Sequence, residues 1–369
     1  MKSYPNFFER IGVGEAEAKK RVQDCFDTIF FDPENGFYHD VDPDSGCMED
    51  TGNIDARTEG MSYGMMMCVQ MDRQDLFDKL WTFSMRYMHQ SAGKYEGYFA
   101  WSVQLDGKHN AEGPAPDGEE YFAMALFMAD ARWGSREGIY NYDAMARDIL
   151  RHCVHQSEMV EGGKPMWNPD NHYIKFVPDM EISDPSYHLP HFYELFAQRA
   201  DECDRDFWKQ AAAASREYIA STAHPKTGMS PEYAQCDGTP VLMFGKPYAY
   251  YSDAYRVAMN IALDCVWFGK NQPMSDVVTH LQDFFAAQLP EENYKAYDLD
   301  GAAHDEPAMH PPAITAVMAA ASIASDSANA DMWLKRFWEM PMRTGKRRYY
   351  DNCLYFFCLA MLAGQYKIY

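Results

Sequence analysis

Several features are absent from the 369-residue chain, and each absence excludes a class of protein. No apolar run approaches the roughly 18 residues of a membrane helix, and the N-terminus lacks an apolar segment long enough for a secretory signal. Positive charge is scarce: 33 Lys and Arg stand against 55 Asp and Glu, a formal net charge of −22. Such a surface repels nucleic acid and acidic membranes, so a neutral substrate fits it better than a polyanion.

Signatures of metal, nucleotide and disulfide sites are also missing. The nine cysteines are odd in number and show no CxxC spacing, which argues against a disulfide framework and favours a reducing cytoplasm. HExxH and P-loop motifs are absent, and "GVGE" near Gly12 is only half of a dinucleotide fingerprint. His188 and His191 have the i, i+3 spacing of metal ligands, but no carboxylate pattern accompanies them. We therefore expect no metal and no organic cofactor.

Aromatic and apolar residues, by contrast, are abundant. Aromatic residues make up 15% of the chain, more than core packing usually needs, and apolar residues recur with a helical period in twelve segments. Candidate strands are few, and the short runs "HYIKFV" and "VLMF" are expected to form hairpins within loops. The helices are expected near residues 14–31, 57–72, 74–90, 118–133, 141–156, 187–199, 205–221, 252–268, 274–289, 311–325, 329–339 and 351–366.

The helical segments alternate in character. The even-numbered ones, such as "MSYGMMMCVQM" and "CLYFFCLAML", have no charged face, whereas odd-numbered ones such as "EAEAKKRVQDCFDTIF" are amphipathic. A helix that is apolar all round is buried, and an amphipathic helix covers it. Long connections mostly precede the even-numbered helices and short ones follow them. The pattern predicts one all-α domain over residues 1–369, an (α/α) six-fold barrel with six inner and six outer helices and long loops at one rim.

Polar residues stand at the N-terminal ends of the predicted inner helices, where the long loops also lie. A single Asp there can be an ordinary helix cap, because acidic groups favour the positive end of the helix dipole. Glu59 is harder to explain in this way. It lies where the run becomes buried, and its nearest cation in the sequence, Arg57, is two residues away and not on the same helix face. We interpret Glu59 as a functional group in a shared polar cleft.

Two carboxyl groups across an aromatic cleft are what glycoside hydrolysis requires. One stays protonated to protonate the leaving oxygen, and the other stays ionised to activate water or attack carbon. Glu59, backed by an apolar helix, is the better acid because burial raises the pKa of a carboxyl group. Asp253, beside Arg256 and several tyrosines, has donors that can hold an anion and its water. Trp101 and Trp167 lie in long loops, where flat aromatic faces can stack on sugar rings.

Six motifs on inner helices or in the loops that precede them carry a family resemblance. They are "DARTEGMSYGMMM", "GYFAW", "APDGEEYFAMALFMA", "DPSYHLPHFYELF", "YYSDAYRVAMNIALD" and "RYYDNCLYFFCLAML". Together they resemble glycoside hydrolase family 8, and within it the reducing-end xylose-releasing exo-oligoxylanases. The resemblance implies an (α/α) six-fold barrel, an inverting mechanism and xylo-oligosaccharide as the substrate. We expect a monomer or weak dimer with no nucleic-acid or membrane partner.

The resemblance also implies roles for individual residues. Glu59 matches the general acid and Asp253 the general base. Asp117 matches the residue that holds and distorts the sugar next to the cut, while Asp184 and Tyr187 match the pair that supports that ring and the nucleophilic water. Arg256 matches an Arg that steadies the base, and His310 lies in the segment that resembles the kink of the exo-acting enzymes. Arg57 and Trp101 are expected to bind substrate from their places at the rim and in a long loop.

The Pro-rich loop "DEPAMHPPAI" resembles the kink that closes the cleft of the exo-acting enzymes. His310 within it can donate a hydrogen bond to the free anomeric hydroxyl at the reducing end. Around Asp117 the signature of the family's cellulases and chitosanases is matched only loosely, which disfavours their substrates. Two alternatives stay open: an endo-β-1,4-xylanase or other β-glycanase with a cleft open at both ends, and a non-catalytic helical carbohydrate-binding or scaffold protein. The latter would show a fixed repeat period, and we find none.

Overall fold

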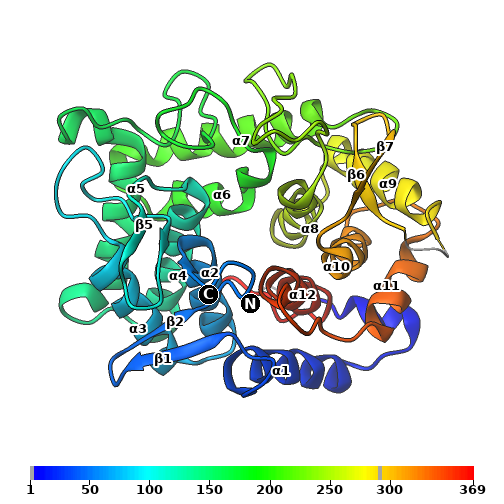
Figure 1. Cartoon of the computed structure of the whole chain (residues 1–369), viewed down its shortest axis with the longest axis horizontal. Coiled ribbons are helices and arrows are strands. Elements are labelled where there is room, and N and C mark those ends of the chain that lie inside the picture. Colours follow the sequence, from blue (N-terminus) through cyan, green and yellow to red (C-terminus); the bar gives the residue numbers. More distant parts are fainter. Residues whose placement is uncertain (1–3, 290–292) are drawn as a thin grey trace.

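Twelve α-helices dominate the computed structural model, which describes residues 4–289 and 293–369, and they alternate along the chain between two concentric rings (Figure 1). The inner ring consists of α2 (Thr58–Gln70), α4 (Pro116–Trp133), α6 (Pro190–Arg199), α8 (Arg256–Phe268), α10 (Pro311–Ala321) and α12 (Arg348–Leu362). The outer ring consists of α1 (Glu15–Phe31), α3 (Gln74–Phe83), α5 (Tyr142–Met159), α7 (Arg205–Thr222), α9 (Gln272–Ala286) and α11 (Ala330–Glu339). The predicted (α/α) six-fold barrel is confirmed.

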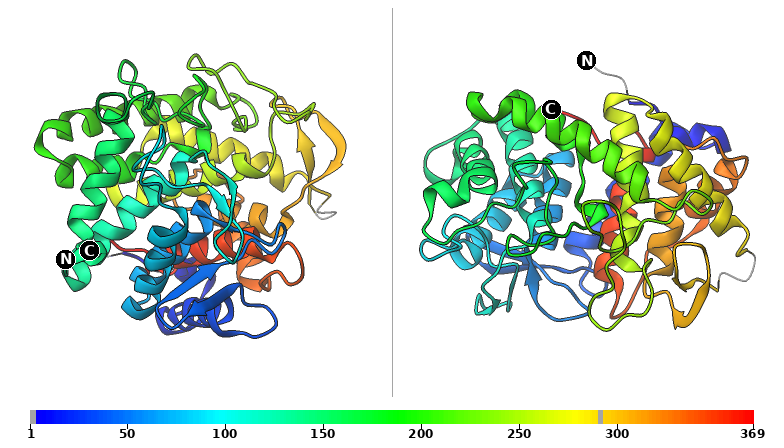
Figure 2. Two further views of the ribbon diagram at one scale, coloured as in Figure 1. Left: turned by 60° about the vertical axis from the view of Figure 1, so that its left-hand side comes forward. Right: turned by 90° about the horizontal axis from the view of Figure 1, so that it is seen from above.

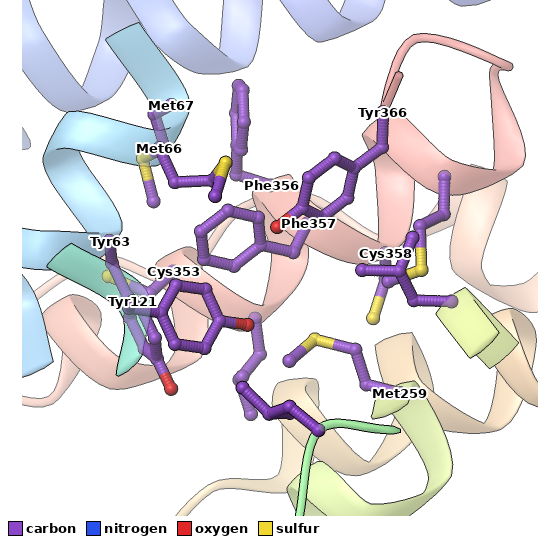
Figure 3. Close-up of a cluster of buried hydrophobic side chains, with 14 of the residues drawn as sticks. Tyr63, Met66, Met67, Tyr121, Met259, Cys353, Phe356, Phe357, Cys358 and Tyr366 are labelled. Carbon is purple, nitrogen blue, oxygen red and sulfur yellow. The ribbon is translucent and has the colours of Figure 1, made fainter. Parts of the chain in front are cut away.

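Apart from α6, where Gln198 is exposed and Glu194 and Arg199 are half-buried, the inner helices lack a charged face because they are packed on nearly all sides. In α12 every residue from Tyr349 to Leu362 is buried, and in α2 every residue except Glu59 is buried. Met66 and Met67 of α2 lie in one apolar cluster with aromatic residues of α12 (Figure 3), so the methionine run fills the core as expected. An outer helix such as α11 buries only one stripe of residues. Burial of a wholly apolar helix thus selects the inner ring.

Two inner helices begin later than predicted. The residues expected to start them form separate 3-10 turns, Pro185–Tyr187 before α6 and Ser252–Tyr255 before α8. Helix α6 begins at Pro190, a residue favoured in the first turn because its missing N–H would have no partner there. The helix expected over residues 74–90 is shorter than predicted, because α3 ends at Phe83 and Ser84–Met88 forms a π-helical turn. The rim residues of α6 and α8 therefore lie in tight turns outside the helices.

Short antiparallel strands occupy the long connections, which gather on one side of the barrel (Figure 2). The predicted hairpins are wrong: Ile174 makes only an isolated bridge with Trp167, and residues 241–244 contain no strand. Apolar side chains of both runs instead line a cavity. The strands are β1 (Tyr38–Asp42) with β2 (Ser45–Met48), β3 (Ala56–Arg57) with β4 (Ser102–Val103) and β5 (His109–Ala111), and β6 (Lys295–Tyr297) with β7 (Ala303–Pro307).

Within residues 4–289 and 293–369, no helix combines the length and apolar character needed to cross a lipid bilayer. All nine cysteines lie in these ranges and carry free thiols. In the same ranges, no cluster of three or more His, Cys, Asp and Glu is arranged to hold a metal ion. His188, weighed above as a metal ligand, is buried between the hydroxyls of Ser183 and Ser215, each 2.8 Å from one ring nitrogen.

Candidate active site

Two cavities open at the rim formed by the N-terminal ends of the inner helices. The larger measures about 460 Å³ and the smaller about 230 Å³. Arg57, Glu59 and Asp253 line both, so the two cavities meet at these residues. The larger cavity has aromatic walls at Trp101, Phe176, Tyr187, Tyr233 and Phe244. A cleft of this form can hold a chain of sugars with one bond at the junction.

Arg256, the first residue of α8, is the cationic centre of this junction. Its Nη1 lies 3.0 Å from Glu59 Oε2 and 3.2 Å from Asp117 Oδ2. Its Nη2 lies 3.7 Å from Asp184 Oδ2 and 3.6 Å from Asp253 Oδ1. One guanidinium, only 4% exposed, thus faces four carboxyl groups from four parts of the chain. A single cation cannot neutralise four anions, so this geometry favours protonation of the more buried ones.

Glu59 is the carboxyl group best suited to act as an acid. Arg256 donates to its Oε2, and the Tyr349 hydroxyl donates to its Oε1 at 2.9 Å. Burial raises the pKa of Glu59; Arg256 lowers it, while Asp117 and Asp253 raise it further, so that the pKa is about 7. A general acid with such a pKa is available near neutral pH.

Asp253 lies in the 3-10 turn before α8 and is more open, with 31% of its side chain exposed. The Tyr233 hydroxyl donates to its Oδ2 at 3.1 Å, and Arg256 approaches its Oδ1. The tyrosines beside Asp253 in the sequence were expected to donate to it. Tyr251 does not, because its hydroxyl donates to the carbonyl oxygen of Pro307. An accessible carboxyl group whose orientation is fixed by donors is placed to hold a water molecule.

Two further carboxyl groups meet Arg256 from different sides. Asp117 lines the larger cavity, and burial raises its pKa, although Arg256 lowers it. Asp184 is fully buried and lines neither cavity; its Oδ1 accepts from the amide of Ser186 at 2.7 Å and caps the 3-10 turn. The capping interpretation therefore holds for Asp184 and not for Asp117, because the N-cap of α4 is Ala115. Asp184 reaches the junction only through Arg256 Nη2, and its expected part in supporting the sugar and the water stays a prediction.

The remaining predicted wall residues lie along the cleft. Arg57 is paired with Asp50 and Asp55 at 3.1 and 3.0 Å and lies over the Trp101 ring at 5.1 Å, so the cation of Glu59 is Arg256 and not Arg57. Tyr187 also lines the larger cavity, with its ring 5.4 Å from the Arg256 guanidinium.

The prediction for Trp167 is wrong. Its side chain is 1% exposed and packs against Tyr193 and Trp208, with ring centroids 5.6 and 5.0 Å away. The loop that carries it folds back onto the core, where a large aromatic ring is better buried than at the cleft.

His310 lies in the smaller cavity, at the N-cap position of α10. Its Nδ1 is 2.8 Å from Asp351 Oδ2, and its ring packs on Tyr350 at 4.5 Å. Arg343 donates to the carbonyl oxygen of Met309 at 2.8 Å and also contacts Asp351. This network holds the end of the Pro-rich loop against the barrel, with one side of the imidazole ring oriented by a carboxylate.

Sequence reasoning missed a group of residues in the connection between α7 and α8. Glu232 is 4% exposed in its side chain and lies 2.8 Å from Lys246 Nζ, and its Oε1 accepts from the amide of Asp253 at 3.5 Å. Together with Tyr233, it holds both the backbone and the carboxylate of Asp253. This connection has no helical or strand period, so nothing in the sequence indicated which of its residues face the cleft.

We expect kcat/KM on oligosaccharides to fall above a pH of about 7. A carboxyl group can donate a proton only when it is protonated, and the protonated fraction of Glu59 falls about tenfold per pH unit above its pKa. Initial rates on an oligosaccharide and on β-xylobiosyl fluoride, whose leaving group needs little protonation, test this. The fluoride should lack the alkaline fall. If it shows the same fall, the fall does not come from protonation of the leaving group, and Glu232, whose pKa burial also raises to about 7, is the first group to replace by Gln.

An aromatic cleft in an (α/α) barrel, with a buried carboxyl group of raised pKa and a second, open carboxyl group across one guanidinium, defines a glycoside hydrolase. The chain belongs to the glycosyl hydrolases family 8, which matches residues 43–364.

Known proteins with similar sequences and structures support this membership. The chain is 51% identical to the reducing-end xylose-releasing exo-oligoxylanase Rex8A of Paenibacillus barcinonensis, over 100% of this chain and 97% of that protein. It is also 51% identical to the reducing end xylose-releasing exo-oligoxylanase of Halalkalibacterium halodurans, over 100% of this chain and 95% of that one. The structure of Rex8A complexed with xylose matches with a TM-score of 0.97, covering 100% of this chain and 98% of that one.

Proposed function

We propose that this enzyme is an inverting glycoside hydrolase that releases xylose from the reducing end of β-1,4-xylo-oligosaccharides. Glu59 is the general acid and Asp253 the general base. The observation that carries the proposal is the position of this pair at the junction of two unequal cavities, the smaller of which is bounded by His310 and Tyr350. The 51% identity to two proteins named for this activity supports the substrate class.

In the proposed reaction the bond between the anomeric carbon and the glycosidic oxygen breaks as Glu59 gives its proton to that oxygen. Asp253 takes a proton from a water molecule whose oxygen forms the new bond to the anomeric carbon. Glu59 becomes an anion, and Arg256, 3.0 Å away, stabilises it. The Tyr233 hydroxyl fixes the orientation of Asp253 toward the water. Asp117 and Tyr187, on the wall of the larger cavity, are placed to hold the sugar that is attacked.

The shared guanidinium limits the separation of the two proposed catalytic carboxyl groups. Arg256 touches both Glu59 and Asp253, so their nearest oxygens lie no farther apart than these two contacts and the width of one guanidinium. That limit admits both the roughly 6.5–9.5 Å of inverting enzymes and the roughly 5–5.5 Å of retaining enzymes, so the anomer of the first product is the test of inversion.

We expect the enzyme to cut xylotriose into xylobiose and xylose and to spare reduced xylotriose, whose terminal ring is opened. Early proton NMR spectra should show the new end of xylobiose as the α-anomer, because inversion converts a β-linkage to α. Reduced xylotriose is the matched control for recognition of the reducing end. Equal cleavage of the two substrates would reject the reducing-end assignment, and early β-anomer would reject inversion.

The alternative is an endo-β-1,4-xylanase or another β-glycanase of the same family. The chain is also 26% identical to endoglucanase 2 of Ruminiclostridium josui, over 85% of this chain and 65% of that protein. This similarity is the reason to retain the alternative. An endo-enzyme needs a smaller cavity that opens outward. Two hydrogen bonds instead fix the Pro-rich loop beside that cavity: Arg343 donates to Met309 and Tyr251 donates to Pro307. A fixed loop at this place favours the exo-enzyme.

We expect His310→Ala to weaken the discrimination between xylotriose and reduced xylotriose by about three- to tenfold, the value of one hydrogen bond to a neutral hydroxyl. His310 lines the smaller cavity, and Asp351 orients its ring. Comparative kcat/KM values on the two substrates measure the effect. The matched control is His280→Ala, a substitution in outer helix α9. If discrimination is unchanged in His310→Ala, the residue only packs at the start of α10.

We further propose that residues 1–369 act as one catalytic domain, since one continuous apolar cluster joins inner and outer helices in the described ranges. A cytoplasmic location and a monomeric or weakly dimeric state remain part of the proposal. Cell fractionation and size measurement in solution test them.

A further inference from the structure

Phe244 is the most exposed large apolar residue in the part of the chain that the structure describes, at 69%. It is not at a random surface position, because it lines the larger cavity together with Phe176 and Tyr233. Its backbone has a φ of 57°, a left-handed conformation that costs free energy for a bulky residue. An aromatic ring held in water by a strained backbone requires an explanation beyond packing.

The loop around Phe244 is anchored on both sides. The amide of Val241 donates to the carbonyl oxygen of Tyr233 at 2.8 Å, and Lys246 Nζ is paired with Glu232 at 2.8 Å. Between them, the amide of Lys246 closes a turn on the carbonyl oxygen of Met243 at 3.1 Å. The two anchoring residues, Glu232 and Tyr233, are the same two that hold Asp253. The position of Phe244 is therefore fixed relative to the proposed base.

The ring of Phe244 meets its aromatic neighbours edge to face. Its centroid lies 6.4 Å from that of Phe176 and 5.8 Å from that of Tyr233, with interplanar angles of 71° and 72°. Edge contacts of this kind, together with the large exposure, leave ring surface uncovered. The apolar face of a sugar ring is the natural complement of such a surface. Tyr233 lies between Phe244 and Asp253, so a sugar against Phe244 is farther from the cut than the ring attacked at Asp253.

We propose that Phe244 is a specificity-determining residue that stacks on a xylosyl unit in the larger cavity, beyond the unit that is attacked. This inference rests on the proposed function and deepens it, because it identifies a residue that sets the preference for chain length. Preorganisation by the two anchors reduces the ordering cost of binding, so the contact favours substrates long enough to reach it. Xylobiose, which occupies only the two positions beside the cut, gains nothing from it.

The test compares Phe244→Ala with the wild type on xylobiose, xylotriose and xylotetraose. We expect the ratio of kcat/KM on xylotetraose to kcat/KM on xylobiose to fall about two- to tenfold, the range for an aromatic contact. The loss should lie mainly in KM. Phe244→Tyr, which keeps the ring, should retain the preference. Leu242→Ala is the matched control, because Leu242 is 55% exposed in the same loop and lines neither cavity.

Two outcomes would overturn this inference. An equal loss on xylobiose and xylotetraose would mean that Phe244 only supports the fold of the loop, and no loss at any length would mean that no sugar stacks there. Failure of the proposed function is distinguishable from either. A wild type that cuts xylotriose and reduced xylotriose alike would lose its exo assignment while the comparison of chain lengths still decides the role of Phe244.

Discussion

Glu59→Gln is expected to lower the rate of xylo-oligosaccharide hydrolysis by about 10²–10⁴-fold, the usual contribution of a general acid. The substitution keeps the size of the side chain but removes the acidic proton. Glu59 now accepts from two donors, Arg256 and Tyr349. The glutamine amide keeps one oxygen, which can still accept from Arg256. The measurement is kcat on xylotriose, with the melting temperature recorded alongside.

β-Xylobiosyl fluoride makes the assignment of the acid specific. Fluoride leaves without much protonation, so Glu59→Gln should hydrolyse it far better, relative to the wild type, than it hydrolyses xylotriose. Glu158→Gln is the matched control, because Glu158 is 73% exposed on outer helix α5. Turnover of xylotriose by Glu59→Gln at the wild-type rate would remove Glu59 from the acid role.

The ring of helices was predictable because burial leaves a direct mark on sequence. Helices such as α12 are apolar on every face, and only a position inside a second ring of helices buries every face. The exact starts of α6 and α8 were not predictable, because 3-10 turns carry the same apolar residues as the helices they precede. The strands were missed since they are only two to five residues long and largely lack alternation, as in β1.

The residues at helix ends were easier to predict than those in loops. Glu59, Asp117 and Arg256 lie at the starts of inner helices, and the barrel geometry alone brings these starts to one rim. Glu232 and Phe244 come from one long connection, whose path depends on contacts with distant segments. Contacts between distant segments leave no periodic pattern in a single sequence, so they could not be predicted from it. The same limitation explains why Trp167 was placed at the cleft.

The balance of charge at the junction gives the carboxyl groups different roles. Four of them face Arg256, and two of these, Glu59 and Asp253, line both cavities, with 17% and 31% of their side chains exposed. Burial and the neighbouring anions raise the pKa of Glu59, whereas Asp253 is more exposed and accepts a hydrogen bond from the Tyr233 hydroxyl. We therefore expect that, after removal of the Asp253 carboxyl group, a substrate with a better leaving group does not restore the rate.

Asp253→Asn is expected to lower hydrolysis by about 10²–10⁴-fold on xylotriose and on β-xylobiosyl fluoride alike, because both reactions need a base to activate water. Asparagine keeps an oxygen for the Tyr233 hydroxyl, so the turn before α8 should retain its structure. Asp237→Asn, in an exposed part of the same connection, is the matched control. The contrast with Glu59→Gln, which is impaired on only one of the two substrates, separates base from acid. If Asp253→Asn hydrolyses the fluoride at the wild-type rate while Asp117→Asn does not, the base is Asp117, the other carboxyl group that touches both Arg256 and the larger cavity.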